Sequence, residues 1–216
     1  FSGAAQWAFK DFGTPLRPEN PIPYVNQKGL LDRQSRPKDA YYVFKSYWNQ
    51  RDPFCYIESH TWDERYGPRG KAREVCVYSN CPKVELKHNG KSLGLKQRDI
   101  SKFPAANLHW QVEFIEGQNQ LIAIGYHDGN PVAYDTVLVT YYFQKPKTAK
   151  KLVLKAEKVG AYRYLLTVLA VDENGRRSLN YNKRVYFSAL QGARLLEYLG
   201  TPDGSSIIEM ANGRAQ

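Results

Sequence analysis

The sequence predicts a mainly β protein: two antiparallel β-sandwiches preceded by an irregular leader and one amphipathic helix. Apolar residues recur at every second position from residue 52 onward, and turn signals rich in Gly and Asn separate these stretches. A helical period of apolar residues is confined to the first fifty residues. With 216 residues, the chain is long enough to bury a core without disulfide support.

The composition is that of a folded, soluble chain. Apolar residues make up 42% of the sequence and aromatic residues 13%, which excludes a disordered protein. No apolar run approaches the roughly 20 residues that a membrane-spanning helix needs. The N-terminal run FSGAAQWAFK has no basic segment followed by an apolar one, so we expect neither a signal peptide there nor a membrane partner.

A net charge of +10 raises the question of a nucleic-acid partner. Most of the excess lies in residues 145–184, which contain eleven basic and three acidic residues. These charges are spread singly along strand-like stretches, without the glycine-rich aromatic signature of an RNA-binding sheet. We therefore expect a solvated face and no nucleic-acid partner, and contact with an acidic polymer is the alternative.

Neither the cysteines nor the histidines form a metal-binding pattern. Cys55, Cys76 and Cys81 are odd in number, which implies no disulfide framework, and the spacing of Cys76 and Cys81 fits no zinc site. We expect Cys76 and Cys81 to pack within strands. The four histidines are scattered, so we predict no metal and no cofactor.

One helix is predicted at residues 37–48, after a leader dense in proline. Ser35 is placed to cap it, and Pro37 falls in the first turn, where its missing N–H costs nothing. A single helix with an irregular leader cannot form a domain, so we expect its apolar stripe to pack on another unit. The stripe consists of Ala40, Val43, Phe44, Tyr47 and Trp48.

Residues 52–143 are predicted to form the first sandwich, of the immunoglobulin-like type. Asn89-Gly90 between two alternating stretches is a strong hairpin signal, and the unit as a whole contains about seven short predicted strands at regular spacing up to residue 142. Alternation assigns Val84 and Leu86 to the interior. In the next clear stretch it places Leu108, Trp110, Val112 and Phe114 inside, and His109, Gln111 and Glu113 in water.

A linker at residues 144–151 separates this unit from a second immunoglobulin-like sandwich, predicted at residues 151–216. Strands are expected at residues 163–171 and 184–188, and a turn at Glu173-Asn174-Gly175. Only about 70 residues are left for a fold that usually takes roughly 100. We therefore expect this second sandwich to be incomplete in the sequence.

The first fifty residues resemble a known enzyme family. The runs WAFKDF at residues 7–12, NQKG at 26–29, DR at 32–33 and PK at 37–38 occur in order before the predicted helix. Together they look like the last strand and last helix of the catalytic (β/α)8 barrel of glycoside hydrolase family 2. This family includes β-galactosidases and β-glucuronidases, and the resemblance assigns residues 1–50 to the end of its barrel.

The rest of the chain resembles the same enzymes. Residues 54–142, with YSNC at 78–81, VEL at 84–86 and NGKSLG at 89–94, are similar to the sandwich that follows the barrel in many bacterial members. Residues 151–216, with GAR at 192–194 and YLGTPDG at 198–204, look like a further C-terminal immunoglobulin-like domain.

The resemblance implies the C-terminal portion of an exo-acting, retaining β-glycosidase. Both catalytic glutamates of the family would lie upstream of Phe1, so we expect no catalytic residue in this chain and no activity from it alone. Asp11 matches an aspartate that is not the nucleophile, which implies a structural role. The implied partners are a carbohydrate substrate and the rest of the barrel, and a periplasmic or secreted bacterial enzyme is favoured.

Three residues are candidates for substrate binding: Trp7, Asn26 and Lys28. An indole plane can cover the apolar face of a sugar ring. In β-glucuronidases an Asn-x-Lys pair at this place binds the uronic acid carboxylate, so the resemblance slightly favours a β-glucuronide over a β-galactoside. The structural alternatives are that Trp7 closes the barrel core, that Asn26 caps a turn and that Lys28 is solvated.

A second hypothesis makes the sandwiches a non-catalytic carbohydrate-binding or structural module. It draws on the basic segment at residues 145–184 and on three tyrosines expected to be exposed, Tyr66, Tyr134 and Tyr181.

Overall fold

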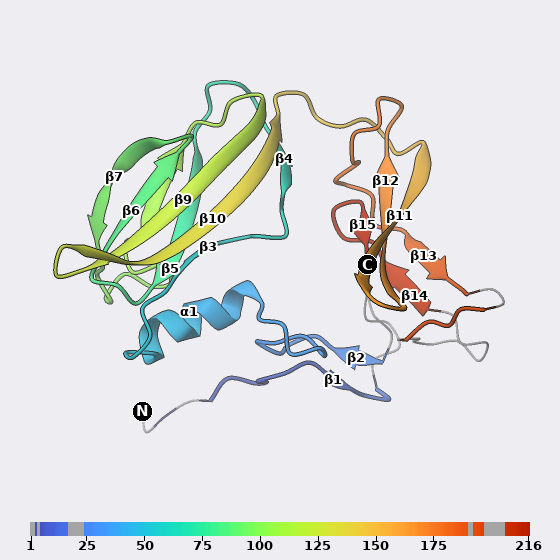
Figure 1. The fold of residues 1–216 in the computed structure, drawn as a ribbon, viewed down its shortest axis with the longest axis horizontal. Coiled ribbons are helices and arrows are strands. Elements are labelled where there is room, and N and C mark those ends of the chain that lie inside the picture. The colour runs from blue at the N-terminus through green and yellow to red at the C-terminus, as the bar shows by residue number, and fades with distance from the viewer. Residues whose placement is uncertain (1–2, 4, 17–23, 190–191, 197–205) are drawn as a thin grey trace. The chain divides into compact units, whose positions relative to one another are not determined.

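The computed structural model describes residue 3 and residues 5–16, 24–189, 192–196 and 206–216. The protein is mainly β, as the sequence predicts (Figure 1). It divides into two units, residues 30–145 on the one hand and residues 1–29 with 146–216 on the other, and each is described by itself. The YLGTPDG run at 198–204 lies outside the described residues. Within the described ranges, no helix has the length and apolar character needed to cross a membrane.

Residues 30–145 contain two sheets that face each other as a β-sandwich. One has the order β4-β10-β9-β6-β7 and the other the order β3-β5-β8. Paired strands run antiparallel except β10 and β4, which are parallel. The larger sheet consists of β4 (Glu64–Tyr66), β10 (Asn130–Tyr142), β9 (Gly117–His127), β6 (Lys83–His88) and β7 (Lys91–Gln97). The smaller sheet consists of β3 (Cys55–Ile57), β5 (Arg73–Ser79) and β8 (His109–Val112).

The core between these sheets follows the predicted alternation. Val84 and Leu86 of β6 are buried, and so are the residues assigned to the interior around β8. Gln111 and Glu113 are exposed, and His109 is half-buried. The predicted register is therefore confirmed for Leu108, Trp110, Val112 and Phe114.

The predicted hairpin is also confirmed. Asn89 and Gly90 connect β6 to β7 with φ values of 49° and 81°. Asp128 and Gly129 connect β9 to β10 in the same way, with φ values of 49° and 81°. Positive φ at both central residues is the mark of a type I′ turn, whose twist matches that of the strands.

The helix α1 (Asp39–Trp48) begins two residues later than predicted, and the predicted cap is wrong. Ser35 lies in a tight turn with a φ of 67°, and the helix starts from Lys38 without a side-chain cap. Pro37 pairs with Leu31 in an isolated bridge, which keeps residue 37 extended instead of helical.

The face of α1 that packs on the sandwich coincides only in part with the predicted stripe. Tyr42 and Val43 pack against a small cluster of Tyr56, Tyr78 and Ala105. Ser46, on the same face, is buried and donates its hydroxyl to the Val43 carbonyl at 2.7 Å. Of the predicted stripe, Val43 takes part in this packing, and Tyr47 contacts the sandwich beside it, with its ring centroid 5.7 Å from that of Phe103. Ala40 and Trp48 are exposed, and Phe44 leans on Trp48 with ring centroids 4.8 Å apart.

Residues 146–216 form a second, smaller pair of sheets. Their common core contains Val168, Ala170, Val185, Met210 and Ala215. The predicted strand at residues 163–171 is observed with the same bounds, and the predicted strand at 184–188 ends one residue earlier. One sheet has the order β11 (Lys151–Gly160), β12 (Arg163–Val171), β15 (Arg214–Ala215), and the other pairs β13 (Arg184–Phe187) with β14 (Ser206–Glu209).

Candidate functional site

A short strand pair near the N-terminus brings the three candidate sugar-contact residues onto adjacent segments. Phe12 of β1 (Phe12–Gly13) lies opposite Asn26 of β2 (Val25–Asn26) in an antiparallel ladder. Further along the same two segments, the Ala8 N–H donates to the Lys28 carbonyl at 3.3 Å. Trp7 directly precedes Ala8, so the candidate residues Trp7, Asn26 and Lys28 belong to one local structure.

Asp11 holds the two segments together from inside. Its side chain is buried, and Oδ1 accepts a hydrogen bond from the Gly29 N–H at 2.9 Å. A Cβ atom at position 29 would lie 2.3 Å from the backbone nitrogen of Asp11, so only glycine allows this close approach. The position agrees with the structural role that the sequence assigns to Asp11.

Asn26 and Lys28 are connected by a turn. The Asn26 Oδ1 accepts a hydrogen bond from the Lys28 N–H at 3.0 Å, which is an Asx turn. This bond involves the Oδ1 atom of Asn26 and not its Nδ2 group. The Lys28 side chain is exposed and Asn26 is half-buried. A turn at Asn26 and a ligand-binding role for both side chains are thus compatible.

Trp7 offers an aromatic surface in this structure. Its side chain is 70% exposed, and its ring meets Phe12 edge-on with centroids 6.1 Å apart. The peptide bond between Trp7 and Ala8 is cis. The indole of Trp7 therefore presents most of its surface to solvent.

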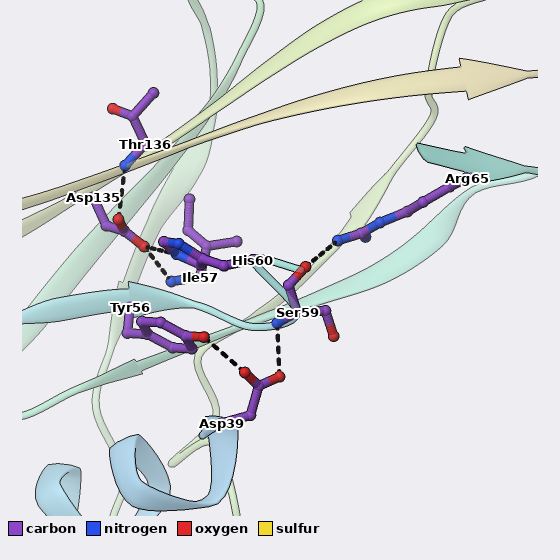
Figure 2. A network of polar contacts seen from close by, with 8 residues as sticks. All are labelled: Asp39, Tyr56, Ile57, Ser59, His60, Arg65, Asp135 and Thr136. Atoms are coloured by element: carbon purple, nitrogen blue, oxygen red, sulfur yellow. Dashed lines mark hydrogen bonds and ion pairs between the residues drawn. The ribbon is translucent and has the colours of Figure 1, made fainter. Parts of the chain in front are cut away.

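A second polar constellation, which sequence reasoning missed, joins α1 to the first sandwich (Figure 2). Asp39, in the first turn of α1, accepts hydrogen bonds from the Tyr56 hydroxyl at 2.7 Å and the Ser59 N–H at 2.8 Å. Asp135 of β10 accepts from the Ile57 N–H at 2.6 Å, and its Oδ2 lies 2.7 Å from Nε2 of His60. Two carboxylates thus hold residues 56–60 from opposite sides.

The ring of Tyr56 is held in an aromatic stack. It lies parallel to Tyr42 of α1 with a centroid distance of 3.6 Å, and parallel to His60 with a distance of 4.4 Å. Burial, together with the hydrogen bond to Asp39, raises the pKa of the Tyr56 hydroxyl well above its usual value. Tyr56 therefore stays protonated and remains a donor across the physiological range.

Arg65 closes the loop that follows. Its guanidinium donates to the Trp62 carbonyl at 2.9 Å and to the Ser59 carbonyl at 3.3 Å, as the dashed contact to Ser59 in Figure 2 shows. Burial lowers the pKa of Arg65. His60 belongs to this loop and contacts Asp135.

Cys76 lies in β5, as predicted, whereas Cys81 lies in the bend between β5 and β6. Cys55 and Cys81 are free thiols in the core, and a Cβ atom on Gly125 would lie 2.9 Å and 2.5 Å from their sulfurs. The contact between the two thiols lowers the pKa of Cys81, and the same contact together with burial raises the pKa of Cys55. Among the described residues, no cluster of three or more His, Cys, Asp and Glu side chains could hold a metal ion.

The tyrosines expected to be exposed behave differently from one another. Tyr134 is exposed, but Tyr66 is half-buried and Tyr181 packs against the second core. The sequence pattern around Tyr66 and Tyr181 does not indicate which neighbouring residues cover them. The fully exposed tyrosine is Tyr162, at the turn between β11 and β12.

Comparison with known sequences identifies relatives along the whole chain. A family described as "Domain of unknown function (DUF4982)" matches residues 70–133. A putative β-glucuronidase of Formosa agariphila is 56% identical over 215 residues, which cover 100% of this chain and 26% of the relative. A β-glucuronidase of Bacteroides fragilis is 31% identical over 147 residues, covering 67% of this chain and 20% of that protein. The β-galactosidase BoGH2A of Bacteroides ovatus is 29% identical over 166 residues, covering 74% and 18%.

Solved structures show the same relationship. The β-glucuronidase 3 of Bacteroides uniformis matches 97% of this chain and 27% of its own, with a TM-score of 0.85 and 42% identity. The β-glucuronidase of Parabacteroides merdae matches 97% of this chain and 26% of its own, with a TM-score of 0.85 and 40% identity. The chain therefore spans about a quarter of the length of the proteins that it matches most fully.

Proposed function

Since this chain belongs to glycoside hydrolase family 2, we propose that it is the C-terminal portion of an exo-acting, retaining β-glycosidase with a preference for β-glucuronides. The observation that carries this proposal is the arrangement of Trp7, Asn26 and Lys28 on two adjacent segments held by Asp11. The relatives support it, because those just described are β-glucuronidases by name except for one β-galactosidase. A neutral galactoside is the competing substrate.

In this proposal the chain binds and orients the sugar, and the catalytic carboxyl groups belong to another part of the full-length protein. A retaining glycosidase uses two carboxyl groups roughly 5 to 5.5 Å apart, one as acid/base and one as nucleophile. The family resemblance places both upstream of Phe1, so the 216 residues alone should not hydrolyse a glycoside. Trp7 would cover the apolar face of the terminal sugar, and Asn26 and Lys28 would bind its carboxylate.

The electrostatics of this pair favour an anionic group. The Lys28 ammonium is an exposed positive charge, and the Asn26 turn fixes the backbone from which it projects. A charge-assisted hydrogen bond to a carboxylate contributes about 1.5 to 3 kcal/mol. Its loss should lower kcat/KM for a glucuronide roughly ten- to more than a hundredfold.

The test uses the full-length protein that contains these residues. Aryl β-glucuronide and aryl β-galactoside hydrolysis are measured for the wild type, for Lys28→Ala and for Lys102→Ala, an exposed lysine in the sandwich that serves as a control. We expect Lys28→Ala to lose glucuronide activity while galactoside turnover stays the same or improves. The control should match the wild type on both substrates.

Other outcomes would contradict parts of the proposal. Equal losses on the two substrates would mean that Lys28 merely supports its loop. Faster galactoside than glucuronide turnover by the wild type would favour the neutral sugar. Absence of hydrolysis of any glycoside by the full-length protein would favour the non-catalytic module.

A further inference from the structure

Two of the three cysteines meet in the core of the first sandwich. Cys55 is the first residue of β3, and Cys81 lies in the bend after β5, two residues beyond Ser79, the pairing partner of Cys55. Both are free thiols, with exposed fractions of 8% and 2%. Cys76 packs instead against the small cluster that contacts α1. Cys55 and Cys81 therefore form a pair, and Cys76 lies apart from it.

The distance between the two sulfurs is limited by Gly125 of β9, a strand of the larger sheet. A Cβ atom built on Gly125 would lie 2.9 Å from Sγ of Cys55 and 2.5 Å from Sγ of Cys81. The two sulfurs are therefore no more than about 5.4 Å apart, the sum of these distances, against about 2.0 Å in a disulfide bond. Glycine inside a strand often marks the close approach of another group. Here both thiols approach the same point of the strand and share one small space.

Ser79 connects the two cysteines. Its Oγ accepts hydrogen bonds from the Cys55 thiol at 3.5 Å and from the Cys81 N–H at 3.0 Å, and it donates to the Phe54 carbonyl at 2.6 Å. The Cys81 thiol donates to the same carbonyl at 3.8 Å. The contact with Cys55 lowers the pKa of the Cys81 thiol, which favours Cys81 as the thiolate of the pair.

From this geometry we propose that Cys55 and Cys81 are a modification site, at which a low-molecular-weight disulfide oxidises the thiol pair to a disulfide bond. The Cys81 thiolate attacks one sulfur of the small disulfide, breaks its S–S bond and releases one thiolate. The Cys55 thiolate then attacks the Cys81 sulfur of this mixed disulfide, forms the protein S–S bond and releases the second thiolate. The protein loses two electrons and two protons, and the small disulfide is reduced to two thiols.

The reaction requires local opening of the chain, because both sulfurs are buried. The opening is small, since Cys55 begins a strand of three residues at the edge of its sheet and Cys81 lies in a bend. The bond would connect the start of β3 to the bend that follows β5 and would close a ring of residues 55–81. A cross-link of this kind stabilises the folded state mainly by restricting the unfolded chain.

Peptide mapping of the full-length protein detects the bond directly. The protein is incubated with glutathione disulfide, blocked with iodoacetamide and digested with trypsin without reduction. Trypsin releases Cys55 within residues 52–65, and both other cysteines within residues 74–83. We expect a cross-linked product of these two peptides, two hydrogen atoms lighter than their sum. Cys76→Ala is the matched control and should retain the cross-link, whereas Cys81→Ala should lose it.

The redox equilibrium shows whether the fold favours the bond. The equilibrium constant for oxidation of Cys55 and Cys81 is measured in mixtures of glutathione and glutathione disulfide, once in the folded protein and once in denaturing urea. A disulfide that stabilises the fold must, by linkage, form more readily in the folded chain. The usual stabilisation by a disulfide corresponds to a roughly thirty- to several-hundredfold larger constant in the folded protein.

Three results would each overturn the proposal. One is the absence of the cross-link after equilibration, and another is a constant that is equal or smaller in the folded protein, which would mean that the sandwich holds the sulfurs apart. The third is a cross-link through Cys76, which fragmentation of the peptide 74–83 between residues 76 and 81 reveals even should Cys76→Ala fail to fold. None of these measurements uses a glycoside, so the proposed function is tested independently of them.

Discussion

Replacement of Trp110 by alanine should be the most damaging single change in the first sandwich. Trp110 lies in β8, is 4% exposed and belongs to the main core between the two sheets. Its Nε1–H donates to the Gly94 carbonyl of β7 at 3.1 Å, and the Lys96 ammonium lies 5.5 Å from the centre of its ring. The side chain therefore links the smaller sheet to the outer strand of the larger one.

The magnitude follows from the area that Trp110 buries. A tryptophan side chain buries about 150 to 250 Å², which at roughly 25 cal/mol per Å² corresponds to about 4 to 6 kcal/mol. Alanine retains a small part of this area, and the surroundings relax into the cavity, so we expect a loss of about 3 to 5 kcal/mol. The Gly94 carbonyl adds little, because residue 94 is exposed and its carbonyl regains water.

Urea unfolding of the 216-residue chain, followed by far-UV circular dichroism, measures this loss. Gln111→Ala is the matched control, since Gln111 is the next residue of β8 and is exposed; it should stay within about 0.5 kcal/mol of the wild type. Trp110→Phe, which keeps most of the ring, should fall between the two. A Trp110→Ala loss below about 1 kcal/mol relative to Gln111→Ala would refute the reasoning.

Three further predictions follow from contacts and pKa shifts. Gly125→Ala should lower the free energy of unfolding by about 1 to 3 kcal/mol, because its Cβ would lie 2.5 Å from the Cys81 sulfur; an unchanged urea midpoint would mean that both sulfurs move aside freely. Gly29→Ala should reduce glucuronide kcat/KM of the full-length protein about a hundredfold by displacing the Asn26 and Lys28 segment, whereas Gly13→Ala, with its nearest atom at 3.9 Å, should not; equal effects would contradict this. Burial raises the pKa of Cys76 from 9.0 to about 12, so between these pH values the unfolded chain releases a proton that the folded chain retains. The free energy of unfolding should therefore keep its full value below pH 9.0 and decrease as the pH rises toward 12. Urea midpoints between these pH values should fall less steeply in Cys76→Ala, and an identical slope would contradict the assignment.

The sandwiches could be predicted from the sequence because, in a strand with one solvent-exposed face, the alternation of apolar and polar residues identifies the buried face. The alternation from Leu108 to Phe114 admits one register, since a slip by one residue would bury Gln111 and Glu113. The Asn89-Gly90 turn is equally local, because the two residues adopt the positive φ values that they tolerate better than others. These features needed no knowledge of distant neighbours.

The face of α1 and the polar network could not be predicted in this way. The helix has apolar residues on two overlapping faces, and its period alone does not tell which face meets the sandwich. Tyr42 lies outside the predicted apolar stripe because its hydroxyl is polar, yet its ring stacks on Tyr56. Asp135 meets Ile57 across 78 positions of the chain, and Asp39 meets Tyr56 across 17, so no local spacing indicates either contact.

The two faces of α1 differ in what covers them. Tyr42, Val43 and Ser46 face the sandwich, whereas Phe44 and Trp48 are left on the other side, with Trp48 70% exposed. Under the proposed function the remaining barrel covers these two aromatic rings, so α1 is shared by the barrel and the sandwich. Burial of large apolar side chains stabilises such contacts but does not fix their orientation, because the hydrophobic effect is non-directional. The hydrogen bonds of Asp39 to Tyr56 and Ser59 are directional, and they fix the orientation of the first turn of α1 on the sandwich.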